Sequence, residues 1–406
     1  MSETSPSASP DPPELSHSTP EQEGSDSPEM SAEELAEARE YGRRGLMCDL
    51  ADRVVDLVYL TLAAWFLARP LDGWLAGLPG MEKNDSLRLV ALFALVTGLH
   101  VLVSLPLSFY SGHLLEHQYG LSTQTVAGWL WRYAKRHLLG LAFGALMFLG
   151  LYWLIWTTGA YWWLAAAGAF FVVSVVLGQL APVLIMPLFY KIEPFEHPEL
   201  SARLARLAEG TGLSIEGIYR MALSEETVKA NAMLAGLGRT RRVILGDTLL
   251  DGFAPEELEV IFAHEIGHHV HRHLPKLLAI GLVYSLAGFW VCDRLLAAWV
   301  VHVDGRVDYA NFPVYTLPMV MLILSIFTTL VEPFQNALSR HFERQSDRYA
   351  LARTGSREAY LSAFRKLARL NKDDPNPHWL EVALLHSHPP IAQRLAMAEM
   401  KPPPKG

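Results

Sequence analysis

Cysteine and charge are both scarce in this 406-residue chain. Its two cysteines, Cys48 and Cys292, lie far apart in apolar stretches, which excludes a disulfide framework and favours two buried thiols. Only 19% of the residues are charged, whereas 51% are hydrophobic. That balance is too apolar for an ordinary soluble protein of this length, so we expect membrane-spanning segments. The N-terminal segment has no apolar run behind a basic start, so we do not expect a signal peptide.

The acidity of the chain is confined to its first segment. Residues 1–40 carry eleven acidic side chains and one arginine, so the rest of the chain is close to neutral although the net charge is −8. The same segment is rich in serine, proline and glutamate and has almost no large apolar residues. Such a segment cannot bury enough surface to offset its ordering entropy. We therefore predict that residues 1–45 form a disordered acidic tail.

Six apolar stretches reach or approach the roughly 20 residues that cross a bilayer. They cover residues 51–69, 89–109, 138–156, 161–185, 277–301 and 314–334. Any one of them could be a buried core helix, but six together, with tryptophan-rich ends such as residues 152–164, indicate membrane spans. Basic residues beside the spans place both termini and the two large polar segments on the cytoplasmic side. The sequence therefore predicts an α-helical polytopic membrane protein.

The polar segments between the spans define the expected domain organisation. Residues 46–190 hold the first four spans, with a cytoplasmic loop at 110–137, and residues 277–334 hold the last two. Residues 191–276 have the pattern of a small cytoplasmic α/β segment that ends in a helix. Residues 335–406 form a second cytoplasmic segment, which we expect to be helical.

The segment AHEIGHHVHRH, residues 263–273, contains five histidines. His264 and His268 are four residues apart, so on a helix they lie one turn apart on one face and both imidazoles can reach one ion. Glu265 lies beside the first histidine, where its carboxylate can take a proton from a water at that ion. A catalytic zinc site has three protein ligands and one open position, so this pattern predicts such a site with a third ligand elsewhere.

The other three histidines of the segment have a plainer interpretation. On a continued helix His269 and His273 point away from His264 and cannot share its ion. His271 is on the same face but two turns away, within reach of His268 only. We expect these three to form a polar, basic face near the membrane surface, with a weak accessory metal site as the alternative.

The segment SRHFERQSDRYA, residues 339–350, offers the missing ligand. Glu343 and Asp347 are four residues apart and therefore share one helical face. Taken alone, such a pair is more often a solvated face beside Arg340 and Arg344. With a metal motif lacking a ligand elsewhere, we place Glu343 on the metal and Asp347 on the free nitrogen of a ligand histidine. His341 is the weaker competitor for the third ligand position.

Several longer strings resemble one known family. The strings are LPLSFYSGHLLEHQYGLSTQT (105–125), APVLIMPLFYKIEPF (181–195), NAMLAG (231–236), VILGDTLL (243–250), HEIGH (264–268), FERQSDRYA (342–350) and SHPPIAQRL (387–395). In this order they resemble the integral-membrane zinc metalloproteases of the type 1 CAAX prenyl protease family, with the bacterial heat-shock membrane endopeptidases as more distant kin. The resemblance runs from about residue 40 to residue 400.

The resemblance implies one zinc ion held by His264, His268 and Glu343, with Glu265 as general base and acid. It implies about six transmembrane helices around a chamber, with a small cytoplasmic α/β zinc-protease domain that contains the HExxH helix. Eukaryotic members have an additional first span, and here the acidic tail stands in its place.

The resemblance also implies residues that handle the substrate. Asn231 and Ala232 match a segment along which the peptide lies as an added strand, since an exposed strand edge binds peptides through backbone hydrogen bonds. His388 and Arg394 match residues near the zinc, where they could stabilise the developing oxyanion or orient Glu343. Considered singly, Asn231 is a turn residue and Arg394 is a surface arginine.

These patterns together predict a membrane-embedded zinc metalloendopeptidase, acting in membrane-protein processing or quality control. Trimming of prenylated CAAX proteins is the specific alternative, and a zinc transporter or buffer is the alternative from another class. We expect a peptide or membrane-protein substrate and the lipid bilayer as partners, and no nucleic acid. Arginine far outnumbers lysine, which favours a bacterial inner membrane, with the active site facing the cytoplasm, over the ER membrane of a eukaryote. The oligomeric state does not follow from the sequence.

Overall fold

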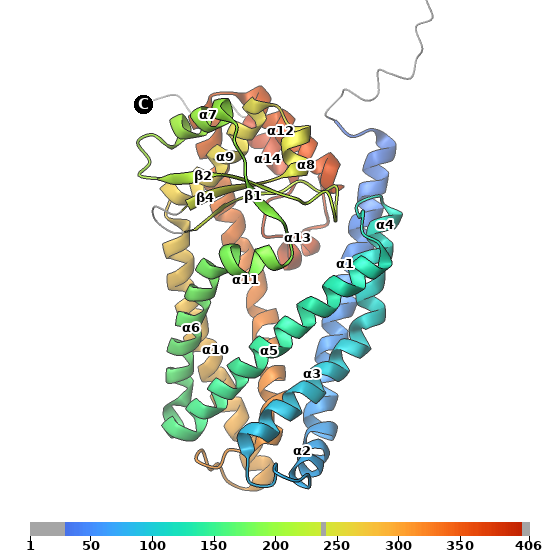
Figure 1. Cartoon of the computed structure of the whole chain (residues 1–406), viewed down its shortest axis with the longest axis vertical. Coiled ribbons are helices and arrows are strands. Elements are labelled where there is room, and N and C mark those ends of the chain that lie inside the picture. The colour runs from blue at the N-terminus through green and yellow to red at the C-terminus, as the bar shows by residue number, and fades with distance from the viewer. Residues whose placement is uncertain (1–28, 237–240, 400–406) are drawn as a thin grey trace, which may run out of the picture.

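The computed structural model describes residues 29–236 and 241–399. Two layers follow one another along its long axis (Figure 1). One layer consists of long helices, and the other is a smaller unit of short helices and strands at one end. We call the smaller unit, residues 192–270 and 340–399, the α/β layer.

Five continuous helical stretches are long and apolar enough to cross a membrane. They cover Ala32–Ala76, Asp85–Gln118, Val126–Leu188, His273–Asp304 and Val314–Thr354. The third stretch turns back on itself between α5 (Val126–Thr158) and α6 (Trp162–Leu180). The turn is at Gly159, whose φ of 59° is a left-handed conformation that glycine adopts without strain. The six apolar stretches of the sequence thus correspond to five helical stretches, one of which has two legs, and the predicted fold class is confirmed.

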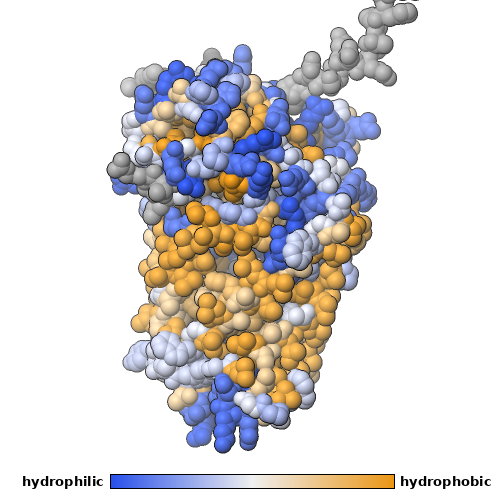
Figure 2. Space-filling model, viewed as in Figure 1, coloured by the Kyte–Doolittle hydropathy of each residue, from blue (hydrophilic) through white to orange (hydrophobic). Residues whose placement is uncertain are grey.

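The surface of the long-helix layer is apolar. Figure 2 shows a broad hydrophobic band over these helices, with polar side chains gathered over the α/β layer and at the opposite tip. The other long-layer elements are α1 (Ala32–Leu62), α2 (Ala68–Ala76), α3 (Asp85–Phe109), α4 (Glu116–Gln118), α10 (His273–Asp304) and α11 (Leu317–Thr354). Phe66 and Leu330 are about two-thirds exposed. Such exposure of large apolar side chains is what a lipid-facing surface requires.

Polar side chains within the spans face one another. Arg53 of α1 forms a bidentate contact with Glu332 of α11, with Nη1 2.6 Å from Oε2. Ser325 of α11 donates to Asp56 of α1 at 2.6 Å, and His100 of α3 lies 3.6 Å from the same carboxylate. Ionisable groups at this depth are costly in lipid, so they mark the inward-facing sides of α1, α3 and α11.

The start of α1 corrects one prediction. Residues 1–28 lie outside the described residues, but α1 begins at Ala32 within the segment that was expected to be disordered. Ser31 and Glu34 form a capping box that satisfies free backbone groups at this helix start. Glu34 and Glu37 then pair with Arg369 and Lys372 of the α/β layer at 2.7 and 2.6 Å. Composition gave no sign of these distant basic partners.

The segment 110–137 corrects a second prediction, because most of it is helical. The helix α3 continues through a π-helical turn, Tyr110–Leu115, into α4. Thr125 then caps the start of α5 by accepting from the backbone of Gly128. Only residues 119–125 connect these helices, so the expected long loop is a short one.

The α/β layer is built on a four-stranded sheet of order β1-β2-β4-β3. Its elements are β1 (Ile192–Pro194), α7 (Pro198–Ala208), β2 (Ile215–Met221), β3 (Ala232–Ala235), β4 (Arg241–Gly246), α8 (Asp247–Gly252), α9 (Pro255–Val270), α12 (Arg357–Asn371), α13 (Trp379–Leu385) and α14 (Ile391–Glu399). Strands β2 and β4 are parallel, whereas β3 is antiparallel to β4 and forms one edge of the sheet. The α/β segment predicted at 191–276 contains this sheet and ends in α9.

Candidate metal centre

The helix α9 carries the HEIGH motif between two apolar clusters. Leu258, Phe262 and Ile266 pack toward the core formed with β4 and α7. Val260 packs on the other side against Tyr360 of α12. Because the helix is buried on both sides, its polar residues must lie on the remaining face, toward α11 and the adjacent pocket.

A glycine brings α9 against α11. A Cβ atom at Gly267 would lie 2.8 Å from Cα of Ser346 and 3.2 Å from its carbonyl oxygen. Real Cβ atoms do not approach backbone atoms this closely, so the two helices can cross here only because residue 267 has no side chain. The crossing places Glu343 and Asp347 of α11 beside the histidines of α9.

Ligand atoms of three residues converge at this crossing. Nε2 of His264 lies 3.2 Å from Nε2 of His268 and 3.1 Å from Oε2 of Glu343, and Nε2 of His268 lies 3.2 Å from Oε1 of Glu343. A tetrahedral zinc site with bonds of about 2.0–2.1 Å needs ligand atoms about 3.3 Å apart. The spacing therefore fits one small divalent cation.

A poorly satisfied oxygen supports the same conclusion. Oε2 of Glu343 is buried and makes no well-aligned hydrogen bond in the described part of the chain, although Nε2 of His264 lies 3.1 Å away. A buried carboxylate oxygen without a donor is costly unless a cation neutralises it. His264, His268 and Glu343 are also the residue types that hold catalytic zinc. The residues present thus fit the metal that the sequence predicts, and they form the one group of at least three candidate ligands found among the described residues.

Asp347 and Arg394 fix the orientation of His264. Oδ1 of Asp347 accepts a hydrogen bond from Nδ1 of His264 at 2.8 Å, which leaves Nε2 free as a ligand atom. Arg394 donates through Nη2 and Nε to both oxygens of Asp347, at 2.5 and 3.0 Å. Asp347 therefore lies where the sequence placed it. Arg394 differs from the expectation that it orients Glu343, because its hydrogen bonds are to Asp347, and its Nη2 also lies 3.4 Å from Nδ1 of His264.

His273 contradicts the expected polar face. The helix α9 ends at Val270, Arg272 adopts a left-handed conformation with φ of 53°, and α10 starts at His273. The imidazole of His273 consequently turns inward, is 1% exposed, and places Nδ1 3.0 Å from Nδ1 of His268. Pro275 was the signal for this break, since proline is tolerated in the first turn of a helix but not in its interior.

The remaining candidates lie away from the cation position. Nδ1 of His269 lies 2.6 Å from Nη1 of Arg241, and the ring of His271 stacks on His273. His341, the competing third ligand, is exposed and within hydrogen-bond distance of Gln345 at 2.9 Å. The structure therefore brings Glu343 rather than His341 to the two ligand histidines.

Burial and neighbouring charged groups shift the pKa values of the residues at the site. Burial alone would lower the pKa of His264, but its hydrogen bond with Asp347 and the adjacent carboxylate of Glu343 raise that pKa to about 9. Burial raises the pKa of Glu265, which the neighbouring histidines partly oppose. A carboxyl group with a raised pKa holds a proton more readily than an exposed glutamate, as a residue that shuttles protons must.

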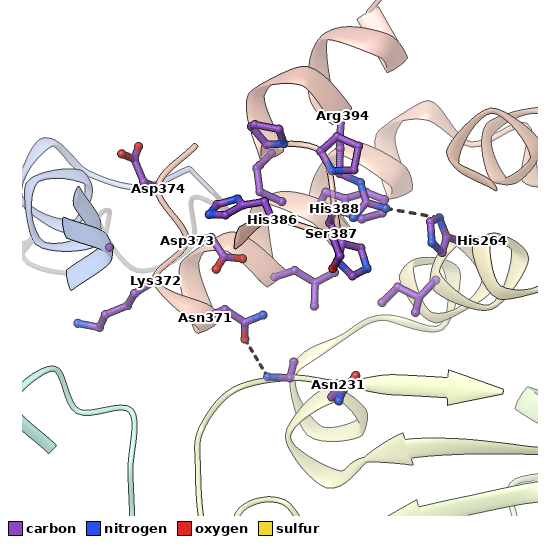
Figure 3. A pocket seen from close by; sticks show the side chains of 18 of the residues that line it. Asn231, His264, Asn371, Lys372, Asp373, Asp374, His386, Ser387, His388 and Arg394 are labelled. Atoms are coloured by element: carbon purple, nitrogen blue, oxygen red, sulfur yellow. Dashed lines mark hydrogen bonds between the residues drawn. The ribbon is translucent and has the colours of Figure 1, made fainter. Parts of the chain in front are cut away.

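A pocket of about 510 Å³ opens in front of the cluster. It is lined by His264 and Glu265 of α9, by Asn231 and Ala232, and by residues between Asn371 and Arg394. Figure 3 shows His264, Asn231 and His388 around this pocket. His388 reaches toward the cluster, with Nε2 3.4 Å from Oε2 of Glu343. The predicted substrate and catalytic residues are therefore brought together around one pocket.

The edge strand β3 borders this pocket. The amide of Gly246 donates to the carbonyl of Asn231 at 2.9 Å, and Ala232 is opposite Leu245. Backbone groups alternate in direction along an antiparallel strand, so Asn231 and Met233 face β4 while Ala232 and Leu234 point to the free edge. Unpaired backbone groups at such an edge can accept an added strand.

Comparisons with known proteins agree with this geometry. The profile described as CAAX prenyl protease N-terminal, five membrane helices, matches residues 16–191. The profile of peptidase family M48 matches residues 194–401, which includes the whole ligand cluster. The boundary between the two profiles falls where the membrane helix α6 and its short continuation give way to the α/β layer.

Several relatives are similar to this chain over most of its length. A Bacillus subtilis protein named uncharacterized metalloprotease YhfN is 30% identical over 91% of this chain and 86% of its own length. The CAAX prenyl protease 1 of Saccharomyces cerevisiae is 27% identical over 90% of this chain and 86% of its own. The crystal structure of S. mikatae Ste24p shares the fold with a TM-score of 0.77 at 24% identity, covering 90% of this chain and 89% of that one. The chain therefore belongs to peptidase family M48, as a polytopic membrane metalloprotease.

Proposed function

We propose that this protein is a zinc-dependent endopeptidase that cleaves extended peptide segments at the surface of the α/β layer. The observation that carries the proposal is the convergence of His264, His268 and Glu343 within 3.1–3.2 Å of one another, beside Glu265. This donor set, with an adjacent carboxylate and an open pocket, is what peptide hydrolysis at a zinc centre requires.

The chain supplies distinct roles around the metal. Zinc, when bound, polarises a carbonyl and lowers the pKa of water. Glu265 takes a proton from the attacking water and passes it to the leaving amine, a transfer favoured by its raised pKa. His388 contributes an imidazole at the mouth of the cluster, where it can donate to the oxyanion that develops on the scissile carbonyl. Arg394 acts through Asp347 and His264 rather than on the substrate.

Substrate binding rests on the free edge of β3. Ala232 presents its N–H and C=O to the pocket, so a peptide can pair with it in an extended conformation. Backbone pairing is independent of side-chain identity, which supports a broad peptide preference.

The decisive experiment compares Glu265→Gln with the wild-type protein. We expect the variant to bind one zinc per chain with unchanged affinity and to lose at least 1,000-fold in cleavage of a fluorogenic peptide. Treatment with a chelator should abolish wild-type cleavage, and added zinc should restore it. Full activity of the zinc-loaded variant would refute the role of Glu265.

Processing of prenylated C-terminal peptides is the second candidate function. It is favoured by the similarity to the CAAX prenyl protease 1 of Saccharomyces cerevisiae and to an Arabidopsis thaliana protein named CAAX prenyl protease 1 homolog, which is 27% identical over 77% of this chain. A prenylated peptide and its unprenylated counterpart should be compared as substrates. A kcat/KM at least tenfold higher for the prenylated peptide would favour this candidate over a broad endopeptidase.

The membrane setting completes the proposal. Basic residues beside the spans support an active site that faces the cytoplasm, and the similarity to a Bacillus protein supports a bacterial cell membrane. The inward-facing polar contacts of α1, α3 and α11 support a hydrated chamber between the spans. Cleavage by inside-out vesicles, but not by sealed right-side-out ones, would test the orientation.

A further inference from the structure

We propose that His273 is a positioning residue for the metal centre, which fixes the tautomer and ring orientation of His268 through a neutral hydrogen-bond relay set by Gln345. The inference rests on the proposed zinc centre and adds to it residues that neither the HExxH motif nor the third ligand includes.

The two ligand histidines differ in the group that faces their Nδ1 atoms. His264 has a carboxylate, that of Asp347, at its Nδ1. His268 has no carboxylate there in the described part of the chain, and the atom 3.0 Å from its Nδ1 is Nδ1 of His273. His268 can bind a cation through Nε2 only if its Nδ1 carries the proton, and that proton then needs an acceptor.

The tautomer of His273 follows from the partners of its two ring nitrogens. Its Nδ1 can accept from His268 only if its own proton is on Nε2. Nε2 of His273 lies 2.9 Å from Oε1 of Gln345, which can only accept. The amide nitrogen of Gln345 lies 2.9 Å from Nε2 of His341, so the opposite end of the same amide has an acceptor too.

The relay therefore has one consistent direction when a metal is bound. Gln345 donates to His341 and accepts from His273, and His273 accepts from His268, whose Nε2 is left free for the cation. Turning the Gln345 amide around would reverse each hydrogen bond and place a proton on Nε2 of His268, where it would block the ligand position.

The packing holds His273 rigidly in this role. Its ring stacks on Phe342 of α11 at a centroid distance of 4.3 Å and an interplanar angle of 11°. Because Phe342 directly precedes Glu343, the same stretch of α11 positions both the third ligand and the partner of the second. A purely structural role for His273 would need this stacking but not the hydrogen-bond acceptor.

Two substitutions of His273 separate its role as a hydrogen-bond acceptor from its role in packing. His273→Phe keeps an aromatic ring on Phe342 and removes the acceptor, whereas His273→Asn places an oxygen near the position of Nδ1. We expect His273→Phe to weaken zinc affinity by about 10–100-fold and His273→Asn to remain within about threefold of wild type. His271→Phe, the same substitution two residues away, is the matched control and should leave the affinity unchanged.

Zinc affinity is measured on the metal-free protein by competition with a chromophoric chelator, and the visible spectrum of the cobalt-loaded protein reports the ligand geometry. Equal losses in His273→Phe and His273→Asn, or no loss in His273→Phe, would overturn the inference. If His273→Phe does not fold, Gln345→Leu provides the same test at a half-buried site, with a weaker affinity expected and an unchanged affinity refuting the relay. If the wild type itself binds no zinc, the proposed function fails as well, which is a distinguishable result.

Discussion

Replacing Gly267 by alanine tests whether the approach of α9 to α11 creates the metal centre. The added Cβ would lie 2.8 Å from Cα of Ser346, whereas carbon atoms pack at about 3.5–4.0 Å. The helices must therefore separate locally by roughly 0.7–1.2 Å, which exceeds the tolerance of about 0.2 Å for metal–ligand distances. Because His264 and His268 flank Gly267 on α9 and Glu343 lies on α11, the separation opens the ligand cluster.

Stability and metal binding should respond differently to this substitution. Overpacking costs about 1–3 kcal/mol, and the higher helix propensity of alanine offsets about 1 kcal/mol of that cost. We expect the metal-free Gly267→Ala protein to lose about 0–2 kcal/mol of unfolding free energy, but its zinc affinity to fall at least tenfold. Gly281 of α10 is a matched control, because a Cβ there meets nothing within 4 Å.

Thermal unfolding of the metal-free proteins and chelator competition for zinc measure the two quantities separately. The same stability loss in Gly281→Ala would show that the solvent or lipid environment, not the crossing, is responsible. If Gly267→Ala bound zinc as tightly as the wild type, the close crossing would not be what sets the ligand geometry, and that reasoning would be refuted.

Three further predictions concern other parts of the site. Asp347→Asn should lower the unfolding free energy by about 3–5 kcal/mol, because it removes the counter-ion of buried Arg394, and it should weaken zinc binding about 10–100-fold. A variant unchanged in thermal unfolding and chelator competition would contradict the contact between Asp347 and Arg394. Ala232→Pro should raise KM for peptides at least tenfold at unchanged zinc affinity, since proline removes the amide at the free edge of β3 but no amide facing β4. The kinetics of peptide cleavage measure KM, and an unchanged KM would exclude pairing of the peptide with this edge. Zinc affinity should rise with pH up to about 9, because the metal displaces the proton that His264 holds below that pKa in the metal-free protein. Calorimetry near pH 7 in buffers of different ionisation enthalpy should count about one released proton per zinc bound, and no release would contradict the raised pKa of His264.

The motif spacing was sufficient to predict which pairs of candidate ligands share one helical face. A separation of four residues places His264 and His268 on one helical face whatever surrounds the helix, and the same holds for Glu343 and Asp347. Apolar length likewise predicts membrane spans, because the bilayer sets the number of residues that cross it. These features depend only on local helix geometry and on the thickness of the bilayer, so the sequence alone could determine them.

The tertiary structure decided what depends on contacts between distant segments. Composition predicted disorder up to residue 45, but Glu34 and Glu37 find basic partners more than 300 residues away and the helix starts at Ala32. The direction of His273 depends on the left-handed backbone at Arg272, which reverses the side chain that a continued helix would turn outward. Arg394 contacts Asp347 rather than Glu343 because α14 approaches α11 at that turn. Spacing along the chain cannot reveal such contacts, since they depend on how separate helices pack.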